Sequence, residues 1–318
     1  MLSISQRKSN RKIGIVGAGS VGASIAYALA ISGLANELVL VDMNTAKAEG
    51  EALDLAHAAA FIKPINIIAG GYEDCSDAGI VIFTAGASQR PGETRIDLLQ
   101  RNYAILRESL PKLMNGTEEK IFLIVSNPVD VLTYAALKIT GLPPERVFGS
   151  GTVLDSSRFR HSLSRHCGVA PRNIHAYVVG EHGDSEVLLW SLAYIAGTRL
   201  DDFCTLTGLP PVNRQQVDSR VRNAGYRIIS KKGATYYAIS LAVKRICESI
   251  IRNENSILTV SGLINGPYGI DGCCLSLPAV VNSAGCSRPL ILPVSGEEEE
   301  KLRKSAGVLK AAIASLSL

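Results

Sequence analysis

The stretch Lys12-Ile13-Gly14-Ile15-Val16-Gly17-Ala18-Gly19-Ser20-Val21-Gly22 decides the fold of this chain. Its first five residues form an apolar run typical of a buried strand, and the glycines that follow have the spacing G-x-G-x-x-G. A helical pattern continues to a glycine stop at Gly33, and a second apolar strand, residues 37–41, ends at Asp42. Strand, glycine triad, helix, strand and acid within about 30 residues predict a βαβ unit that binds a dinucleotide.

Each glycine of the triad has its own physical reason. Gly17 allows the tight turn after the strand, Gly19 lets a pyrophosphate approach the backbone, and Gly22 lets helix and strand pack closely. Val21 lies inside the same turn and is expected at the cofactor as well. Free N–H groups at the helix start favour the negative phosphates. Asp42 can accept hydrogen bonds from both ribose hydroxyls and would repel a 2′-phosphate, so the pattern favours NAD over NADP.

The alternation of strands and helices continues beyond this unit. Helical patterns at 46–60 and 97–115 alternate with buried apolar strands at 79–86 and 121–125. Such alternation predicts an α/β fold with a doubly wound parallel sheet of the Rossmann type, which binds its ligands at the carboxyl ends of the strands. The residues expected at those ends are Gly17, Asp42, Ala85, Gly86, Ser126 and Asn127.

From residue 150 onward the pattern changes, because helical and strand-like segments no longer alternate regularly. We therefore expect two domains, an NAD-binding Rossmann domain at 1–150 and an α+β substrate-binding domain at 151–318. The last helix begins with a capping box at Ser295. The segments expected in this second half are helices at 156–167, 212–232, 235–253 and 295–310, and strands at 256–264, 268–278 and 289–294.

The composition excludes several classes of protein. Of the 318 residues, 47% are hydrophobic and 19% are charged, which is ordinary for a soluble globular protein. The net charge of +4 is not gathered into one block, which argues against a nucleic-acid or membrane-surface protein. No apolar run approaches the ~20 residues that a membrane helix needs.

The reactive side chains indicate a compartment and argue against a metal. The seven cysteines are scattered without a C-x-x-C pair, so we expect reduced thiols in a cytoplasmic protein. Metal-ligand patterns such as H-E-x-x-H are absent from the sequence, so no metal site is expected.

A histidine between two glycines is the main candidate for proton transfer. The run Gly180-Glu181-His182-Gly183-Asp184 follows an apolar, strand-like segment, and histidine changes its charge most readily near neutral pH. Asp155 could orient the ring and raise its proton affinity, and Arg158 could grip a small carboxylate with a two-point fork. The alternative is a turn histidine that faces water, an N-capping aspartate and a surface arginine.

Two polar segments follow strand ends and should face the same crevice. Residues 85–95 form a glycine-bounded polar loop, which is typical of a lid that closes over a substrate and delivers a charge. An ordinary connecting loop is the alternative. Asn127 follows the last buried strand of the first half.

Five motifs in this order resemble the lactate/malate dehydrogenase family. They are G-A-G-S-V-G at 17–22, T-A-G-A-S-Q-R-P-G-E-T-R at 84–95, S-N-P-V-D at 126–130, L-D-S-S-R-F-R at 154–160 and G-E-H-G-D-S at 180–185. The resemblance runs from residue 11 to the C-terminus. It implies that His182 gives and accepts the proton and that Asp155 is its partner. It also implies that Arg158 clamps the substrate carboxylate, Arg95 polarises the carbonyl, and Asn127 hydrogen-bonds near the substrate oxygen.

Two positions distinguish the family's main substrates. Malate-type members carry arginine at one loop position to meet a second carboxylate, whereas lactate-type members carry glutamine; the matching residue here is Gln89. Thr235, in the run 232–235, is similar to the lactate-type pattern in which it lines the pocket near a methyl group. Without a cation there, the second carboxylate of oxaloacetate would be desolvated unpaired, at considerable cost. The resemblance therefore implies pyruvate and L-lactate as substrates.

Regulation and assembly are also implied by the resemblance. Bacterial members that fructose 1,6-bisphosphate activates bind it at a dimer interface through an arginine and a histidine, and the matching residues are Arg160 and His175. We therefore expect activation by this bisphosphate and a homotetramer. A solvated helix arginine and a strand histidine are the alternative. For the function itself, malate or a branched 2-hydroxy acid as substrate, or a nucleotide-binding protein without turnover, stay open.

Overall fold

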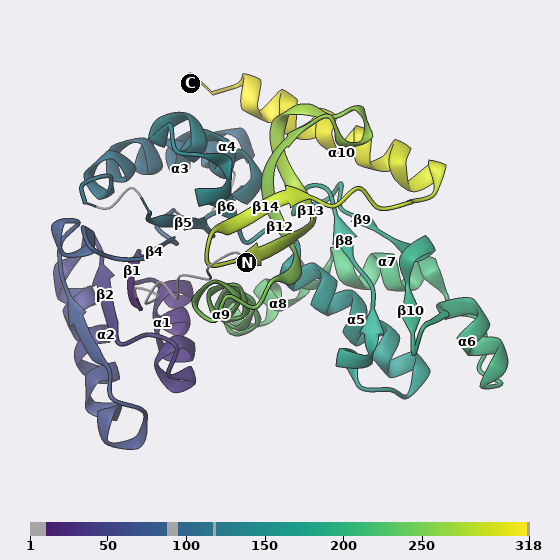
Figure 1. The fold of residues 1–318 in the computed structure, drawn as a ribbon, viewed down its shortest axis with the longest axis horizontal. Coiled ribbons are helices and arrows are strands. Elements are labelled where there is room, and N and C mark those ends of the chain that lie inside the picture. The colour runs from purple at the N-terminus through teal and green to yellow at the C-terminus, as the bar shows by residue number, and fades with distance from the viewer. Residues whose placement is uncertain (1–10, 88–94, 117–118, 317–318) are drawn as a thin grey trace, which may run out of the picture.

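One sheet forms the centre of the molecule. The computed structural model describes residues 11–87, 95–116 and 119–316 (Figure 1). Within this part, nine strands form a sheet in the order β14-β13-β12-β6-β5-β4-β1-β2-β3. Helices cover both of its faces.

The first six strands are parallel, so the predicted doubly wound α/β sheet is confirmed. β1 pairs with both β2 and β4, and the strand order reverses there, as it does at the ligand-binding edge of such sheets. β3 lies where no strand was expected, because its four residues carry only a short apolar run. The six strands are β1 (Lys12–Val16), β2 (Glu37–Val41), β3 (Asn66–Ala69), β4 (Ile80–Phe83), β5 (Ile121–Ile124) and β6 (Val147–Gly149).

Side chains of these strands alternate between two cores. In β4, Val81 and Phe83 pack in the core that α3 (Arg95–Ser109) and α4 (Val129–Thr140) complete. Ile80 and Ile82 pack on the other face, beneath α1 (Ser20–Ser32) and α9 (Tyr237–Ile251). The period of two sends successive side chains to opposite faces. Because both faces are covered, the strand reads as one continuous apolar run.

The second half of the chain extends the same sheet. Three antiparallel strands, β12 (Ser256–Asn265), β13 (Asp271–Asn282) and β14 (Gly285–Pro289), continue it beyond β6. The junction is the antiparallel pairing of Ser261 in β12 with Gly149 in β6.

A smaller lobe with its own core completes the second half (Figure 1). Phe159 and Trp190 pack edge to face there, with ring centroids 4.8 Å apart. Short strands build two small sheets in the lobe: β7 (Ile174–His175), β8 (Val178–Val179), β9 (Val187–Leu188), β10 (Tyr194–Ile195) and β11 (Thr198–Arg199). The remaining helices are α2 (Thr45–His57), which packs on β3, and α5 (Val153–Cys167), α6 (Leu200–Leu206), α7 (Arg214–Arg222), α8 (Ala224–Lys232) and α10 (Gly296–Ala314).

Two segments of the second half differ from expectation. The helix predicted at 212–232 is split into α7 and α8 at Asn223, whose side-chain amide donates to the carbonyl of Ser219 (2.9 Å) and competes with the helix backbone. The strand predicted at 289–294 does not form: β14 ends at Pro289, since a proline has no N–H to give to a ladder.

The last helix begins as predicted. The Ser295 side chain accepts from the N–H of Glu298, and the Glu298 side chain accepts from the N–H of Ser295, which completes the capping box. In the part of the chain that the structure describes, no helix combines the length and the apolar character needed to cross a membrane.

Candidate active site

The three glycines of the first motif have three different surroundings. Gly17 has φ +102°, and a Cβ there would lie 2.6 Å from the backbone nitrogen of Ala85. A Cβ at Gly22 would lie 1.9 Å from the carbonyl oxygen of Gly17. A Cβ at Gly19 would meet nothing within 4 Å. The first and third glycines are thus required by packing, whereas the second leaves open space at the start of α1, as a phosphate-binding turn needs.

Asp42 directly follows β2 beside this turn. Its Oδ2 accepts from the N–H of Ala18 (2.7 Å) and its Oδ1 accepts from the N–H of Asn44 (2.9 Å). The carboxylate is therefore held next to the glycine turn, and its remaining lone pairs are available for hydroxyl donors. These surroundings fit the adenosine ribose of a dinucleotide.

The ends of β4 and β5 lie at the same edge. Ser126 donates through Oγ to the carbonyl oxygen of Ala85 (2.6 Å), which ties the two strand ends together. Gly86 and Asn127 are exposed beside them, and Val21 is half-buried in the first turn of α1. The structure thus brings the predicted cofactor residues to one edge of the sheet.

The histidine, the aspartate and one arginine of the sequence motifs are in direct contact. Asp155 lies in the first turn of α5 and is 1% exposed. Its Oδ2 lies 2.6 Å from Nδ1 of His182, and its Oδ1 accepts from Nη1 of Arg158 (2.7 Å). Because Asp155 engages Nδ1, the Nε2 atom of His182 is the ring nitrogen left for a substrate.

The charges of this cluster reinforce one another. The carboxylate of Asp155 raises the pKa of His182 from 6.5 to about 9, although burial of the ring works in the opposite direction. Burial raises the pKa of Asp155, but His182 and Arg158 together bring it below its ordinary value. At neutral pH the histidine therefore carries a proton and the aspartate a negative charge.

Asp130 supports the histidine from another direction and was not assigned a role from the sequence. It is 1% exposed in the first turn of α4, and its Oδ2 accepts from the backbone N–H of His182 (2.7 Å). Burial raises its pKa from 3.8 to about 6. Its place in the run S-N-P-V-D was visible in the sequence, but 52 positions separate it from its partner.

Asn102 is a second residue that sequence reasoning missed. It is buried in α3, where its Oδ1 accepts from the N–H of Ala87 (2.7 Å) and its Nδ2 donates to the carbonyl oxygen of Asn127 (2.7 Å). It thus links the last described residue before segment 88–94 to the end of β5. A single polar residue at a buried position of an amphipathic helix is the signal that could have identified it.

Some predicted residues lie outside this constellation or outside the described residues. Segment 88–94, which contains Gln89, is outside the described residues, and so is the side chain of Arg95, the first residue of α3. Thr235 is half-buried between α8 and α9. Among the described residues, Thr235 shares no hydrogen bond or ion pair with His182, Asp155 or Arg158.

The residues predicted for regulation lie close together in the smaller lobe. Nε of Arg160 donates to the carbonyl oxygen of Ala176 (2.9 Å), the residue after His175. The Arg160 guanidinium also lies over the Tyr177 ring, 5.4 Å from its centroid. His175 is exposed in β7. The helix arginine is therefore partly buried and fixed beside the strand that carries the histidine.

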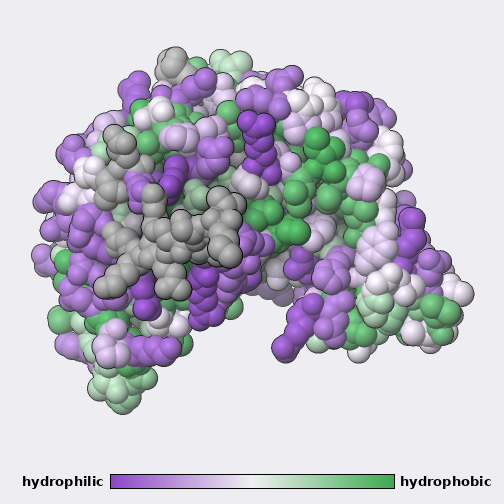
Figure 2. Space-filling model, in the orientation of Figure 1, coloured by the Kyte–Doolittle hydropathy of each residue, from purple (hydrophilic) through white to green (hydrophobic). Residues whose placement is uncertain are grey.

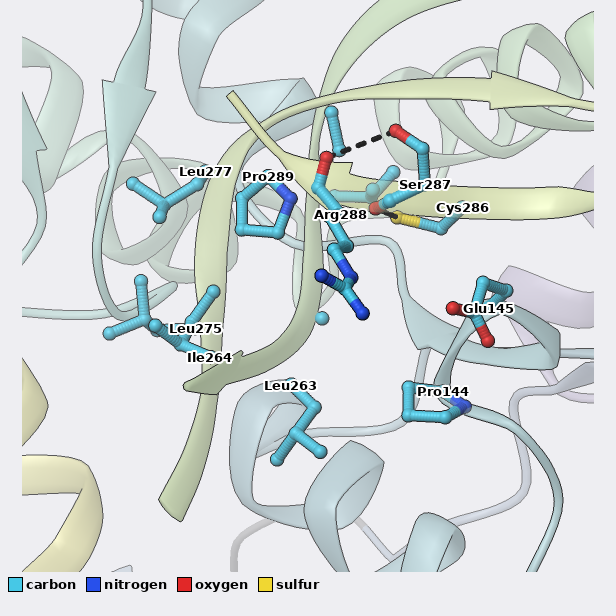
Figure 3. A pocket seen from close by; sticks show the side chains of 13 residues that line it. Pro144, Glu145, Leu263, Ile264, Leu275, Leu277, Cys286, Ser287, Arg288 and Pro289 are labelled. Atoms are coloured by element: carbon cyan, nitrogen blue, oxygen red, sulfur yellow. Dashed lines mark hydrogen bonds between the residues drawn. The ribbon is translucent and has the colours of Figure 1, made fainter. Parts of the chain in front are cut away.

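Two surface pockets lie away from this cluster. The first is lined by β12, β13, β14 and η4 (Pro144–Arg146), and its labelled side chains include Leu263, Glu145 and Arg288 (Figure 3). On the face drawn in Figure 2, apolar side chains gather over these strands. Neither pocket is lined by His182, Asp155 or Arg158. Among the described residues, no group of three His, Cys, Asp or Glu could hold a metal ion.

Comparison with known proteins covers both halves of the chain. The model described as lactate/malate dehydrogenase, NAD binding domain, matches residues 11–149, and the model described as lactate/malate dehydrogenase, alpha/beta C-terminal domain, matches residues 152–317. An L-lactate dehydrogenase of Moorella thermoacetica is 54% identical over 310 residues, which are 96% of this chain and 98% of that protein. One of Thermoanaerobacter sp. (strain X514) is 52% identical over 309 residues, 96% of this chain and 99% of the relative.

The fold is also similar to solved structures. The minor L-lactate dehydrogenase from Enterococcus mundtii, in a ligand-bound form, superposes with a TM-score of 0.94 at 41% identity, over 98% of this chain and 100% of that one. A lactate dehydrogenase from a deep-sea metagenome library of the Medee basin gives 0.93 at 42% identity.

Proposed function

The chain belongs to the lactate/malate dehydrogenase family, and from this premise we propose that it is an NAD-dependent L-lactate dehydrogenase that interconverts pyruvate and L-lactate. The observation that carries the chemistry is the contact of His182, Asp155 and Arg158. The named relatives support lactate as the substrate.

The cofactor is NAD, held by the edge of the sheet described above. The start of α1 with Gly17, Gly19 and Gly22 accommodates the pyrophosphate, and Asp42 accepts from the ribose hydroxyls. Val21, Ala85, Gly86, Ser126 and Asn127 line the rest of the proposed cofactor edge. When bound, NADH supplies the hydride for the keto carbon of pyruvate. The proposed boundary between the cofactor and substrate halves lies at residues 150/151.

His182 supplies the proton that accompanies this hydride. Its Nδ1 faces Asp155, so the proton passes from Nε2 to the keto oxygen. With a pKa of about 9, the ring is protonated before pyruvate reduction at neutral pH, and the neutral ring is the base for lactate oxidation. Asp130 holds the main chain of His182 and so keeps the ring in place.

The arginines hold the substrate. One nitrogen of Arg158 is engaged by Asp155, which fixes the guanidinium and leaves its other N–H groups for the substrate carboxylate. We assign Arg95 the polarisation of the carbonyl, Asn127 a hydrogen bond near the substrate oxygen, and Gln89 and Thr235 the recognition of a methyl group rather than a second carboxylate.

A panel of keto acids with NADH tests the activity and its main alternatives. We expect the highest kcat/KM with pyruvate, and Gln89→Arg should move the preference toward oxaloacetate. If the unmodified protein has its highest kcat/KM with oxaloacetate or a branched keto acid, the substrate is malate or a branched 2-hydroxy acid and not lactate. No NADH oxidation with any of them would favour the non-catalytic alternative. His182→Asn should abolish turnover and leave NADH binding intact.

We also propose activation by fructose 1,6-bisphosphate through Arg160 and His175. The support is that Arg160 is anchored to Ala176 beside His175, so that two potential phosphate ligands lie on adjoining elements. Pyruvate saturation curves with and without the bisphosphate test this. We expect a lower KM with it, and no response in Arg160→Gln; identical curves for the unmodified protein would contradict the proposal.

A homotetramer in the cytoplasm is the proposed state of the protein. Large apolar side chains are exposed on neighbouring helices, and a partner subunit would cover them. They are Tyr27 and Ile31 on α1, Leu53 on α2, and Tyr237 and Leu241 on α9. All seven cysteines are free, which suits a reducing compartment. Light scattering of the purified protein should give four times the 33.8 kDa chain mass.

A further inference from the structure

A buried carboxyl close to the catalytic cluster has no part in the chemistry described so far. Glu186 is 5% exposed, and its Oε1 has no hydrogen-bond partner among the residues that the structure describes. It lies in the β8–β9 hairpin, in the connection that also carries His182, directly before Val187 of β9. Its backbone is fixed, because its N–H donates to the carbonyl of Gly183 and its own carbonyl accepts from Nη2 of Arg222.

Charged residues of two helices and of the hairpin affect the pKa of this carboxyl. α5 contributes Asp155 and Arg158, α7 contributes Arg222, and the hairpin itself contributes His182. Burial raises the pKa of Glu186 to about 8, and Asp155 adds to this, while the three cations lower it. A carboxyl that is desolvated, lacks a donor and lies near another carboxylate is more stable when protonated. Glu186 is therefore uncharged at neutral pH.

Building on the proposed function, we propose that Glu186 is a positioning residue for the substrate clamp. While uncharged, it leaves the positive field of Arg158 to the substrate carboxylate. Once charged, it weakens that field and at the same time makes His182 hold its proton more firmly.

The two effects each raise one kinetic constant and therefore oppose each other in kcat/KM. Above pH 8, the added negative charge should raise the KM for pyruvate, because Arg158 attracts the substrate less. The same charge should keep His182 protonated to a higher pH and so delay the alkaline fall of kcat. The charge of Glu186 thus raises both KM and kcat above pH 8, and a residue with a purely structural role would not raise the two together.

Glu186→Gln tests the inference, because the amide has the same shape and stays neutral at every pH. We would measure kcat and the KM for pyruvate from pH 6.5 to 9.5 at saturating NADH. We expect the rise in KM between pH 7 and 9 to be about threefold to tenfold smaller than in the unmodified protein, as for removal of one nearby charge. The fall of kcat should begin at a lower pH.

Three further variants separate charge from packing. Glu186→Asp keeps an ionisable group and should restore the pH-dependent change in KM. Glu181→Gln is the matched control: it removes a carboxylate from the same hairpin, but one that accepts hydrogen bonds from Ser185, and it should keep the pH dependence of the unmodified protein. Arg222→Gln removes an exposed cation that favours the charged carboxyl, so the rise in KM should move to higher pH.

The outcomes distinguish this inference from the proposed function. If the unmodified protein oxidises NADH with pyruvate and Glu186→Gln has the same pH profiles, the inference is wrong and the function stands. If the unmodified protein does not turn over pyruvate at any pH, both are wrong. If Glu186→Gln does not fold, Arg222→Gln decides: a shift of the KM profile supports the inference, and an unshifted profile overturns it.

Discussion

Replacing Asp155 by asparagine tests the proton chemistry most directly. The amide keeps the size of the carboxylate and can still accept from Nδ1 of His182, so the ring orientation is preserved while the charge is removed. Asp155 is the largest cause of the raised pKa of His182. Without it, Asp130 still raises that pKa, but burial is the larger effect and Arg158 adds to the lowering, so we expect it at 6.5 or below.

The structure sets the size of the expected effect. The His182 side chain is 27% exposed, so solvent screens it only in part. A fall from about 9 to 6.5 is about 2.5 pKa units, or about 3.4 kcal/mol. At pH 7.5 the protonated fraction of His182 would drop from nearly all to about a tenth. Each further unit by which its pKa falls would lower this fraction about tenfold more. We therefore expect kcat/KM for pyruvate reduction to fall about tenfold to a hundredfold at this pH.

The assay is the pH profile of kcat/KM with NADH and pyruvate from pH 5 to 9.5. Its alkaline limb should move to lower pH by about 2.5 units or more, and lactate oxidation at pH 7.5, which needs the neutral ring, should be less impaired than pyruvate reduction. NADH binding measured by fluorescence is the control and should be unchanged. An alkaline limb at its original position would refute the role given to Asp155.

Three more predictions concern stability. Gly22→Ala should lose about 1–3 kcal/mol of unfolding free energy, because its Cβ would lie 1.9 Å from the Gly17 carbonyl oxygen. Gly19→Ala should lose little, because a Cβ there would meet nothing within 4 Å. Equal losses of the two variants in denaturant titrations would contradict this prediction. Burial raises the pKa of Glu298, but hydrogen bonds from Ser191 and Ser295 outweigh burial and lower the pKa below 4.5, so their stabilisation is present above pH 4.5 and is lost on acidification. Glu298→Gln should therefore lose unfolding free energy at pH 7, and this loss should shrink toward pH 4. A loss that stays constant with pH would contradict the role given to the carboxylate. The raised pKa of Glu186 means that folding binds a proton there between pH 4.5 and about 8, so stability falls as the pH rises through this window. The melting temperature of Glu186→Gln relative to the unmodified protein should therefore increase from pH 5 to pH 8.5, and no change would contradict the burial argument.

The parallel half of the fold could be predicted because its signals are local. The glycine triad, the apolar runs of β1, β2, β4 and β5, and the acid at Asp42 each depend on residues close in sequence. The division of 212–232 into two helices could not be predicted, because Asn223 is tolerated within a helix unless its side chain captures a nearby carbonyl. The joining of β12 to β6 depends on a pairing between residues 149 and 261, for which the sequence has no local signal.

The same distinction applies to the site. The resemblance identified His182, Asp155 and Arg158 as a group, and their distances agree with that grouping. Asp130 and Glu186 were missed because a carboxyl in an apolar context has no visible partner in the sequence. What these two residues do depends on which backbone and which charges the fold places around them.

The pairing of Gly149 with Ser261 has a consequence for modularity. The backbone of β6 pairs on one side with β5 from the cofactor half and on the other with β12 from the substrate half. Severing the chain near residue 150 would leave β6 as an unprotected edge with unsatisfied N–H and C=O groups, open to pairing with other chains. The cofactor half is therefore unsuited to transfer by itself into another protein, and in protein engineering the two halves should be kept together.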